Sequence, residues 1–351
     1  MPHAAALSLT VLSVAYPFAP VGPDAAGGAE QVLGQLDAAL VKGGHGSIVV
    51  ANAASKVRGT LVPTKTLPGP ITHEQRHSAW AEHRRNLLRA LAEYHVDVVH
   101  MHGIDFHHYL PLPGPAPVLA TLHLPPSWYG AEAFERRPGV HLHCVSASQR
   151  RACPPGTQLL PDIENGVPVR ALACRCRKRR FALALGRICP EKNLHVALDA
   201  GRRAGVPVLL GGHVFAYETH ERYFREQVAP RLDRERRFIG PLAFGRKRRL
   251  LAAARCVLLP TLAPETSSLV AMEALACGTP VVAFPSGALA DIVEHGVTGF
   301  HVRDEREMAD AIEACGRIDP ERCRAAARER FPAESMLEKY FDVYRRLTAT
   351  A

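Results

Sequence analysis

The stretch FALALGRICPEKNLHVALDAGRRAGVPVLL, residues 181–210, decides the expected fold of this chain. Its two ends, Phe181–Leu185 and Val206–Leu210, are short apolar runs typical of buried strands. Between them, Asn193–Ala204 has apolar residues at helical spacing, so one face of a helix can pack against a sheet. A strand, a helix and a second strand in this order predict parallel strands covered by helices.

The same alternation runs through both halves of the chain. A helix is expected at Glu30–Val41, with Gly43–Gly44 as its C-cap, and residues 166–180, rich in basic residues and weak in periodicity, are expected to be a linker. The other strands expected before the linker are Leu7–Ala15, Ser47–Ala51, Asp97–His102, Pro117–His123 and Val140–Ser146. Beyond residue 210 the expected elements are helix Glu218–Leu232, strand Arg237–Ile239, helix Phe244–Ala254, strand Val257–Pro260, helix Ser268–Ala276, strand Pro280–Phe284 and three further helical stretches, the last at Ala333–Leu347.

This pattern predicts an α/β chain of two Rossmann-like, doubly wound domains. We expect the domains at residues 1–168 and 169–332, with 333–351 as a C-terminal helix that packs back on the first domain. Ligands bind at the carboxyl edges of such sheets, so a cleft between the domains is the expected site. Neither first strand is followed by the glycine pattern of a dehydrogenase, and no P-loop is present in the sequence.

Composition narrows the class of protein further. The 351 residues, 47% hydrophobic and 22% charged, suit two full hydrophobic cores. No apolar run approaches the roughly 20 residues that span a bilayer, and the segment Ala4–Ala15 lacks the basic flank of a signal peptide. The nine cysteines are scattered, odd in number and without a CxxC pair. We therefore expect reduced thiols, no metal site and a cytoplasmic protein.

The formal net charge of +9 raises the alternative of a nucleic-acid partner. Against it, basic residues are interleaved with acidic ones, and no nucleic-acid-binding motif is present. The clusters Arg175–Arg180 and Arg246–Arg249 are expected to be solvated faces. A positive field would still attract a nucleoside diphosphate or an anionic acceptor.

The most informative segment for chemistry is PETSSLVAMEALACGTP, residues 264–280. Glu273 falls inside an otherwise apolar helix, where a carboxylate is costly to bury without partners. The two hydroxyls of a ribose are suitable partners, and the N–H groups at the start of the helix suit a phosphate or sugar oxygen. The alternative is that Glu273 faces solvent on an amphipathic helix.

Read together, these segments resemble retaining glycosyltransferases of the GT-B fold, specifically glycosyltransferase family 4. Glu265 and Glu273 match the E-x7-E motif, and Gly186–Ile188 with Pro190–Asn193 look like the segment whose arginine and lysine grip the donor diphosphate. The other matching segments are Phe238–Leu242, Gly278–Val282 and Gly287–Phe300. The resemblance implies these roles: Arg187 and Lys192 at the diphosphate, Glu265 at a sugar hydroxyl, Glu273 at the ribose, Gly240 and Leu242 beside the base, and Thr266, Ser267, Ser268 and Leu269 in the donor loop.

The first half agrees with this resemblance. Pro20–Glu30 is similar to the family's glycine loop, so Gly27 and Gly28 are expected to approach the donor closely; a flexible turn is the alternative. The family carries a donor-sugar histidine after a later strand, which makes His123 the candidate, whereas His102 is interpreted as structural. Asn165–Val167 matches the family's NGV before the linker.

The chain also departs from the family pattern. Ser267–Ser268 stands where Phe-Gly is common, and Ala290 and Asp291 replace proline and glutamate. These changes affect the donor contacts more than the reaction class.

The resulting prediction is a retaining hexosyltransferase that uses a UDP- or GDP-linked sugar. It needs no cofactor and no metal, because leaving-group charge would be stabilised by Arg187, Lys192 and the helix N-terminus. The acceptor is open, nucleic acid is not expected, and the basic helix 74–94 could contact the inner face of a membrane. The alternatives are a sugar-nucleotide epimerase and a non-catalytic nucleotide-sugar binding protein.

Overall fold

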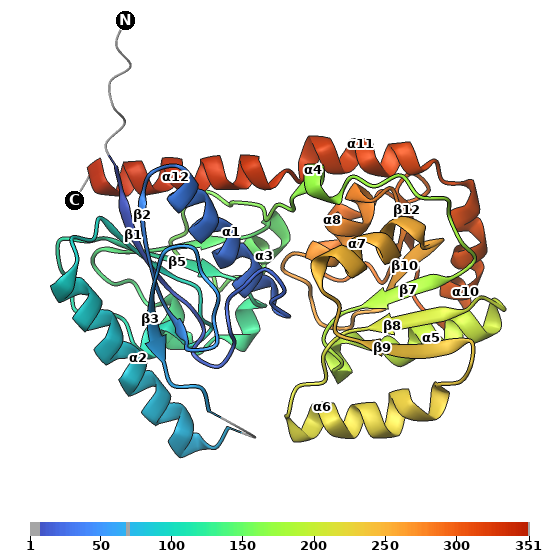
Figure 1. Ribbon diagram of the computed structural model, residues 1–351, viewed down its shortest axis with the longest axis horizontal. Coiled ribbons are helices and arrows are strands. Elements are labelled where there is room, and N and C mark those ends of the chain that lie inside the picture. The colour runs from blue at the N-terminus through green and yellow to red at the C-terminus, as the bar shows by residue number, and fades with distance from the viewer. Residues whose placement is uncertain (1–7, 68–70, 350–351) are drawn as a thin grey trace, which may run out of the picture. The chain divides into compact units, whose positions relative to one another are not determined.

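The computed structural model describes residues 8–67 and 71–349 (Figure 1). The expected first strand therefore begins, at Leu7, outside the described residues. The chain divides into two compact units: unit 1 is Met1–Val145, Arg150–Ile163 and Leu337–Ala351, and unit 2 is Ser146–Gln149 and Glu164–Met336. The domain limits expected from the sequence stay predictions.

Unit 1 contains a six-stranded sheet in the order β3-β2-β1-β4-β5-β6. All neighbouring strands are parallel, as the alternation of strands and helices predicts. The order reverses between β1 and β4, which is the doubly wound arrangement. The strands are β1 (Thr10–Val14), β2 (Gly46–Asn52), β3 (Thr60–Thr64), β4 (Val98–Met101), β5 (Val118–Leu122) and β6 (Val140–Cys144).

The two faces of this sheet are covered by different helices. Side chains alternate across a strand, and in β2 Ile48 and Val50 join the core that includes Leu87 of α2 (His73–Glu93), while Val49 and Ala51 pack with Leu33 of α1 (Gly28–Lys42). The C-terminal helix α12 (Ala333–Ala349) belongs to unit 1 from Leu337 onward. The remaining short elements are η1 (Phe106–His108), η2 (Pro126–Trp128), η3 (Ala131–Phe134) and α3 (Ala147–Arg151).

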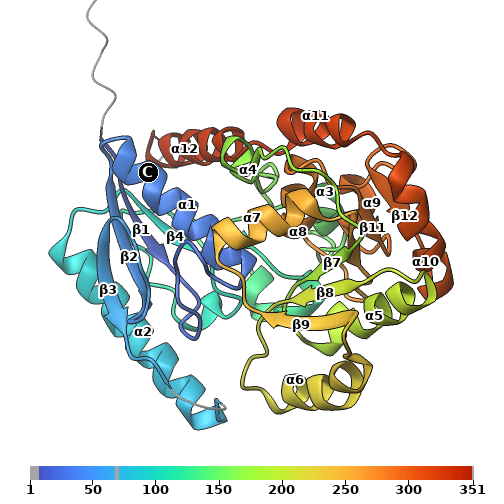
Figure 2. The same cartoon turned by 45° about the vertical axis from the view of Figure 1, so that its right-hand side comes forward.

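Unit 2 contains a second parallel sheet of six strands, in the order β12-β11-β10-β7-β8-β9. Helices α5 and α10 contact each other on one face, and α7, α8 and α11 lie together on the other (Figures 1 and 2). The strands are β7 (Ala182–Leu185), β8 (Val208–Gly211), β9 (Arg236–Gly240), β10 (Cys256–Leu259), β11 (Val281–Ala283) and β12 (Gly299–His301). The helices are α4 (Val169–Leu172), α5 (Leu194–Arg203), α6 (Glu218–Tyr223), α7 (Phe244–Ala253), α8 (Leu269–Ala276), α9 (Leu289–Ile292), α10 (Glu305–Ala314) and α11 (Pro320–Arg330), with η4 (Pro190–Lys192), η5 (Phe224–Val228), η6 (Ala229–Arg231) and η7 (Cys315–Arg317).

Several elements differ from the sequence-based expectation. The helix expected at 218–232 is present as an unbroken helical run, but only its first part is α-helical: α6 ends at Tyr223 and continues through the π-helical turn η5 into the 3₁₀ turn η6. Pro230 lies in η6 and lacks the N–H that an α-helical turn needs. The expected linker contains the one-turn helix α4.

Two edge strands were not expected at all. β3 contains Pro63, which reads as a strand breaker but is tolerated because β3 lies at the sheet edge. β12 has only three residues, and a Cβ on Gly299 would lie 1.8 Å from the carbonyl oxygen of Val281. Glycine is needed there for close approach to β11, and such a residue gives little strand signal.

All nine cysteines are free thiols in the structure. Within the described ranges, no helix combines the length and the apolar character needed to cross a membrane.

Candidate functional site

The carboxyl edge of the unit 2 sheet brings two predicted loops together. The loop after β7 carries Arg187 and η4, and the backbone N–H of Leu262, which follows β10, donates to the carbonyl oxygen of Glu191 at 2.9 Å. Asn193 adopts a left-handed conformation, with φ of 54°, between η4 and α5. This turn fixes the direction in which the loop leaves the sheet.

Lys192 and Glu265 form an ion pair between these loops, from the Lys192 ammonium to Oε1 of Glu265. Their side chains are 22% and 14% exposed, so the pair is shielded but still reachable from solvent. The backbone behind Glu265 is also fixed, because the N–H of Ala288 donates to its carbonyl oxygen at 2.7 Å. Gly287, with φ of 59°, is required there: a Cβ would lie 2.2 Å from that same oxygen.

Arg187 has no ion-pair partner within 4.0 Å in the described part of the chain. It is partly buried and close enough to His220 to lower the pKa of that imidazole, although burial is the larger cause. The guanidinium charge is one of the causes that lower the pKa of Glu191 against the effect of burial. Because it forms no ion pair at contact distance with a described carboxylate, it is available to an anion from outside the chain.

Glu273 is 3% exposed, which excludes the alternative of a solvent-facing residue. Its Oε1 accepts from the ammonium of Lys247 in α7 at 2.6 Å. Burial raises the pKa of Glu273, and the charge and hydrogen bond of Lys247 oppose that rise. The expectation that Arg246–Arg249 is a solvated face is therefore wrong for Lys247, whose side chain is 17% exposed, and right for the exposed Arg246 and Arg249.

The second carboxylate oxygen of Glu273, Oε2, is buried and has no hydrogen-bond partner among the described residues. Ser267 Oγ, in the loop that leads into α8, is buried and unpartnered in the same way. Buried polar atoms are almost always hydrogen-bonded, so two such atoms, one just before α8 and one within it, need an explanation. A bound group with hydroxyl or amide donors would supply one.

The N-terminus of α8 adds donors to this region. Ser268 is the N-cap, and its hydroxyl accepts from the N–H of Ala271 at 3.4 Å. The N–H groups of Leu269 and Val270, in the first turn, have no acceptor within the helix. Thr266 is buried one residue before Ser267.

The segment expected beside the base leaves the end of β9. Gly240, with φ of 69°, accepts from the N–H of Gly212 at 3.0 Å. Leu242 packs over Gly211 of β8, where a Cβ would lie 3.0 Å from a Leu242 methyl carbon. These residues are thus placed at the carboxyl end of the same sheet.

In unit 1, Gly27 is the N-cap of α1 and Gly28 its first residue. A Cβ on Gly27 would lie 1.9 Å from a carboxylate oxygen of Glu30, so Glu30 closes over this turn. The glycine loop is therefore packed by its own helix rather than open along its whole length.

His123 follows β5, and its Nε2 lies 3.0 Å from Nδ1 of His102. Burial lowers the pKa of His123 to about 3, and the pKa of His102 is also well below its usual value. Both rings are therefore neutral. His102, interpreted from the sequence as structural, was not predicted to pair with His123. The available signal was that the two histidines follow neighbouring parallel strands.

The histidines extend into a larger buried network. His100 Nδ1 lies 2.7 Å from the hydroxyl of Tyr344 in α12, and its Nε2 lies 2.6 Å from Thr121 Oγ1. Thr121 also contacts His143 Nε2 at 2.6 Å. This network ties β4, β5 and β6 to the C-terminal helix.

The two sheets and their helices define a protein of the GT-B class. Sucrose-phosphate synthase from Thermosynechococcus elongatus superposes with a TM-score of 0.81 at 19% identity, over 97% of this chain and all of that one. HepE of Anabaena, in a complex with UDP-glucose, superposes with a TM-score of 0.75 at 19% identity, over 96% of this chain and all of that one. These similarities confirm the expected GT-B fold.

The family follows from the second half. Residues 179–316 match the family described as glycosyl transferases group 1. D-inositol 3-phosphate glycosyltransferase of Nocardioides sp. is 38% identical over 120 residues, which is 32% of this chain and 26% of that protein. Over this segment the chain is similar to the glycosyl transferases group 1 family, which agrees with the resemblance to GT-B glycosyltransferases seen in the sequence. Retention and membership of family 4 stay predictions. The chain spans about a quarter of the length of that relative.

Proposed function

We propose that this chain is a glycosyltransferase whose unit 2 binds a nucleotide-sugar donor. The single observation that supports it best is the buried, unpartnered Oε2 of Glu273, on the helix that follows the donor loop of the matched family. A ribose hydroxyl would supply the missing donor. Burial raises the pKa of Glu273, and Lys247 opposes that rise and so favours the ionised carboxylate, whose oxygen accepts more strongly than a neutral one.

The diphosphate would lie between Arg187 and the start of α8. Arg187 is free of carboxylate partners within the described residues, and the helix N-terminus favours an anion. Lys192 would donate to the phosphate as well as to Glu265. The Glu265 carboxylate could then accept a hydrogen bond from a sugar hydroxyl. Together these charges would stabilise the departing nucleoside diphosphate without a metal in the reaction.

The remaining donor residues are proposed on the same basis. Thr266, Ser267, Ser268 and Leu269 would form the donor loop, and Gly240 and Leu242 would lie beside the base. From unit 1 we propose Gly27 and Gly28 as donor-binding residues and His123 as a neutral sugar-contacting residue. Because His123 is neutral at any ordinary pH, it would act as a hydrogen-bonding group and not as a cation.

The chemistry of the substrates is proposed from the same comparison. UDP is bound in HepE, so UDP-sugars are the first donors to test, followed by GDP-sugars. Retention of anomeric configuration is proposed because the resemblance to retaining glycosyltransferases implies it. A same-face displacement is preferred because spacing in the sequence marks no residue as a covalent nucleophile. The acceptor is a glycan, lipid or small molecule, and a cytoplasmic site of action, at the inner face of the membrane if the acceptor is a lipid, is part of the proposal.

A panel of nucleotide sugars tests this function directly. The matching donor should raise the midpoint of thermal unfolding by roughly 5–10 °C at saturation, because a ligand that binds only the folded state stabilises it. Arg187→Ala should lose most of that rise, while Arg322→Ala, which removes an exposed arginine of α11, should keep it. If no UDP-, GDP- or ADP-linked sugar moves the midpoint, the proposal is wrong. Binding without release of free nucleoside diphosphate would indicate a non-catalytic binding protein instead.

A further inference from the structure

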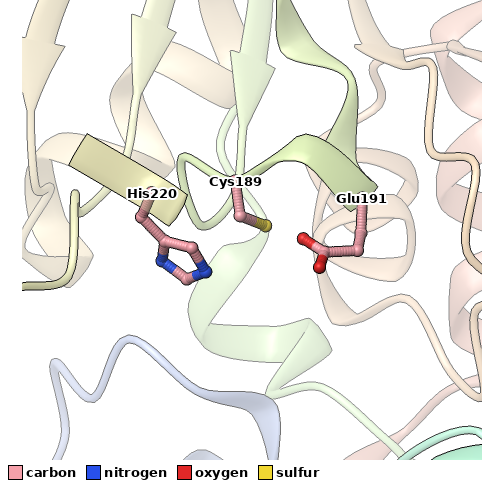
Figure 3. Close-up of side chains that lie close together, drawn as sticks. All are labelled: Cys189, Glu191 and His220. Carbon is pink, nitrogen blue, oxygen red and sulfur yellow. The ribbon is translucent and has the colours of Figure 1, made fainter. Parts of the chain in front are cut away.

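Three side chains with metal-binding atoms converge beside the donor loop of unit 2. Cys189 precedes η4, Glu191 lies within it, and His220 lies in α6, about thirty positions further along the chain. One ligand atom from each, a sulfur, a carboxylate oxygen and an imidazole nitrogen, lies within 4.8 Å of the other two. Figure 3 shows the thiol of Cys189 between the carboxylate of Glu191 and the imidazole ring of His220.

The surrounding structure holds two of these residues in place. The backbone of the Cys189 loop is tied to the neighbouring strand connection, since the N–H of Ile188 donates to the carbonyl oxygen of His213 at 3.0 Å. His220 packs edge-on against the ring of Tyr217, with 5.1 Å between ring centroids. Cys189 and His220 are both buried, and Glu191 is the most exposed of the three. A cation could therefore enter from the side of Glu191.

The cluster has unused binding capacity. The thiol lies 3.6 Å from the carbonyl oxygen of Arg187 and is within hydrogen-bonding reach of the Glu191 carboxylate, so two of the three groups already contact each other. His220 is 8% exposed, and neither of its ring nitrogens makes a hydrogen bond among the described residues, neither Nδ1 nor Nε2, which is the nitrogen nearer the thiol in Figure 3. A buried imidazole nitrogen without a hydrogen-bond partner is unusual in a folded protein. This combination is not explained by packing alone.

The chemistry of the three groups selects the kind of ion. Calcium and magnesium require shells of oxygen ligands, and this cluster offers one carboxylate. A thiolate, an imidazole and a carboxylate suit zinc, with bonds of about 2.0–2.3 Å. Tetrahedral zinc needs ligand atoms roughly 3.5 Å apart, so each pair of ligand atoms must approach by about 1.3 Å at most from the 4.8 Å limit. The rotation of the Glu191 side chain at the surface can supply that movement.

We propose that Cys189, Glu191 and His220 bind one zinc ion that joins the loop of Arg187 and Lys192 to helix α6. The negative charges of the thiolate and the carboxylate balance the two positive charges of the zinc ion. The complex of zinc with Cys189, Glu191 and His220 next to Arg187 therefore has no net charge. The fourth coordination position stays open to water or to a small anion. The ion links two segments structurally and takes no part in the proposed transfer reaction. The proposed zinc site therefore does not depend on the proposed function.

Cobalt binding to the chelator-treated, full-length protein tests the site without measuring activity. Cobalt(II) bound to a thiolate has a strong near-ultraviolet charge-transfer absorption, and zinc added afterwards should abolish it. We expect one equivalent per chain. Cys189→Ser should remove the absorption, and His220→Ala and Glu191→Gln should weaken cobalt binding at least about tenfold, since each removes one ligand.

The main competitor in this chain is a surface pair of thiols. Cys174 and Cys176 have sulfur atoms 3.3 Å apart and Cys176 is exposed, so they could bind cobalt adventitiously. The matched control is the double variant Cys174→Ser/Cys176→Ser, which should keep the full signal. A signal lost in this control but kept in Cys189→Ser would overturn the proposal, as would wild-type protein that binds no cobalt. Glu191→Gln alters an exposed side chain, so it tests the site even if the two buried variants fold poorly.

Discussion

Lys247→Ala is expected to destabilise unit 2 by about 3–5 kcal/mol, because it leaves a buried charge without its partner. Glu273 is 3% exposed, and Lys247 supplies the only hydrogen bond that its carboxylate accepts within the described residues. Without Lys247, the carboxylate must either stay charged in the core or take up a proton at neutral pH. Both routes cost free energy of folding.

The measurement is hydrogen exchange of the α8 backbone, which reports on unit 2 alone. Arg246→Ala is the matched control, since Arg246 is exposed on the same helix as Lys247 and should change the free energy of unfolding by less than about 0.5 kcal/mol. The double variant Lys247→Ala/Glu273→Ala should recover much of the loss. Equal effects of Lys247→Ala and Arg246→Ala would contradict the buried pair.

The pH dependence of this variant has a definite sign. The pKa of Glu273 in the folded state is raised by burial, so the folded state holds its proton more tightly than the unfolded state. Protonated Glu273 favours folding below the ordinary pKa of 4.5, and this contribution is lost as the pH rises through the folded pKa. The difference in the free energy of unfolding between wild type and Lys247→Ala should therefore become smaller as the pH is lowered.

Unit 1 is expected to lose stability steeply between pH 6.5 and pH 5. Five buried histidines have lowered pKa values, mainly because burial disfavours the imidazolium ion: His83 and His143 at about 4, His123 at about 3, and His100 and His102 well below 6.5. In the unfolded chain they take up protons near pH 6.5, so the unfolded state gains protons first as the pH falls. Each contributes up to about 2 kcal/mol of lost stability at pH 5.

Tryptophan fluorescence measures this loss selectively, because both tryptophans of the chain, Trp80 and Trp128, belong to unit 1. His83→Gln should reduce the pH dependence of the free energy of unfolding by the amount that one buried imidazole contributes. His73→Gln, which changes an exposed histidine at the start of the same helix, should leave it unchanged. A midpoint of denaturation that is equal at pH 7 and pH 5 would contradict the neutral histidine network.

The central strands, which are buried on both faces, could all be predicted from local sequence. Leu258 in β10 and Leu183 in β7 belong to continuous apolar runs, which local sequence marks clearly. The edge strands β3 and β12 were not predicted. Their proline and glycine are compatible with a strand only because of where each strand lies in the sheet, and a local sequence pattern does not contain that information. The end of α6 was missed because a π-helical turn has no sequence pattern of its own.

The part of the candidate site that could be predicted is the part whose residues lie close together in the sequence. Glu265 and Glu273 lie on the same loop and helix, so their motif is visible in the sequence. Lys247 was missed because four basic residues run together in α7, and only the packing of α7 on α8 selects the one that turns inward. Cys189 and His220 are brought together by tertiary structure alone.

The most direct test of the donor site compares a nucleoside diphosphate with its 2′,3′-dideoxy form by titration calorimetry. In wild-type protein the parent nucleotide should bind about 10–100-fold more tightly, since hydrogen bonds to a charged acceptor contribute about 1.5–3 kcal/mol. In Glu273→Gln, whose amide oxygen can still accept from Lys247, this difference should largely disappear. A wild-type protein that binds both nucleotides equally, or a Glu273→Gln variant that keeps the full preference, would contradict ribose binding by Glu273.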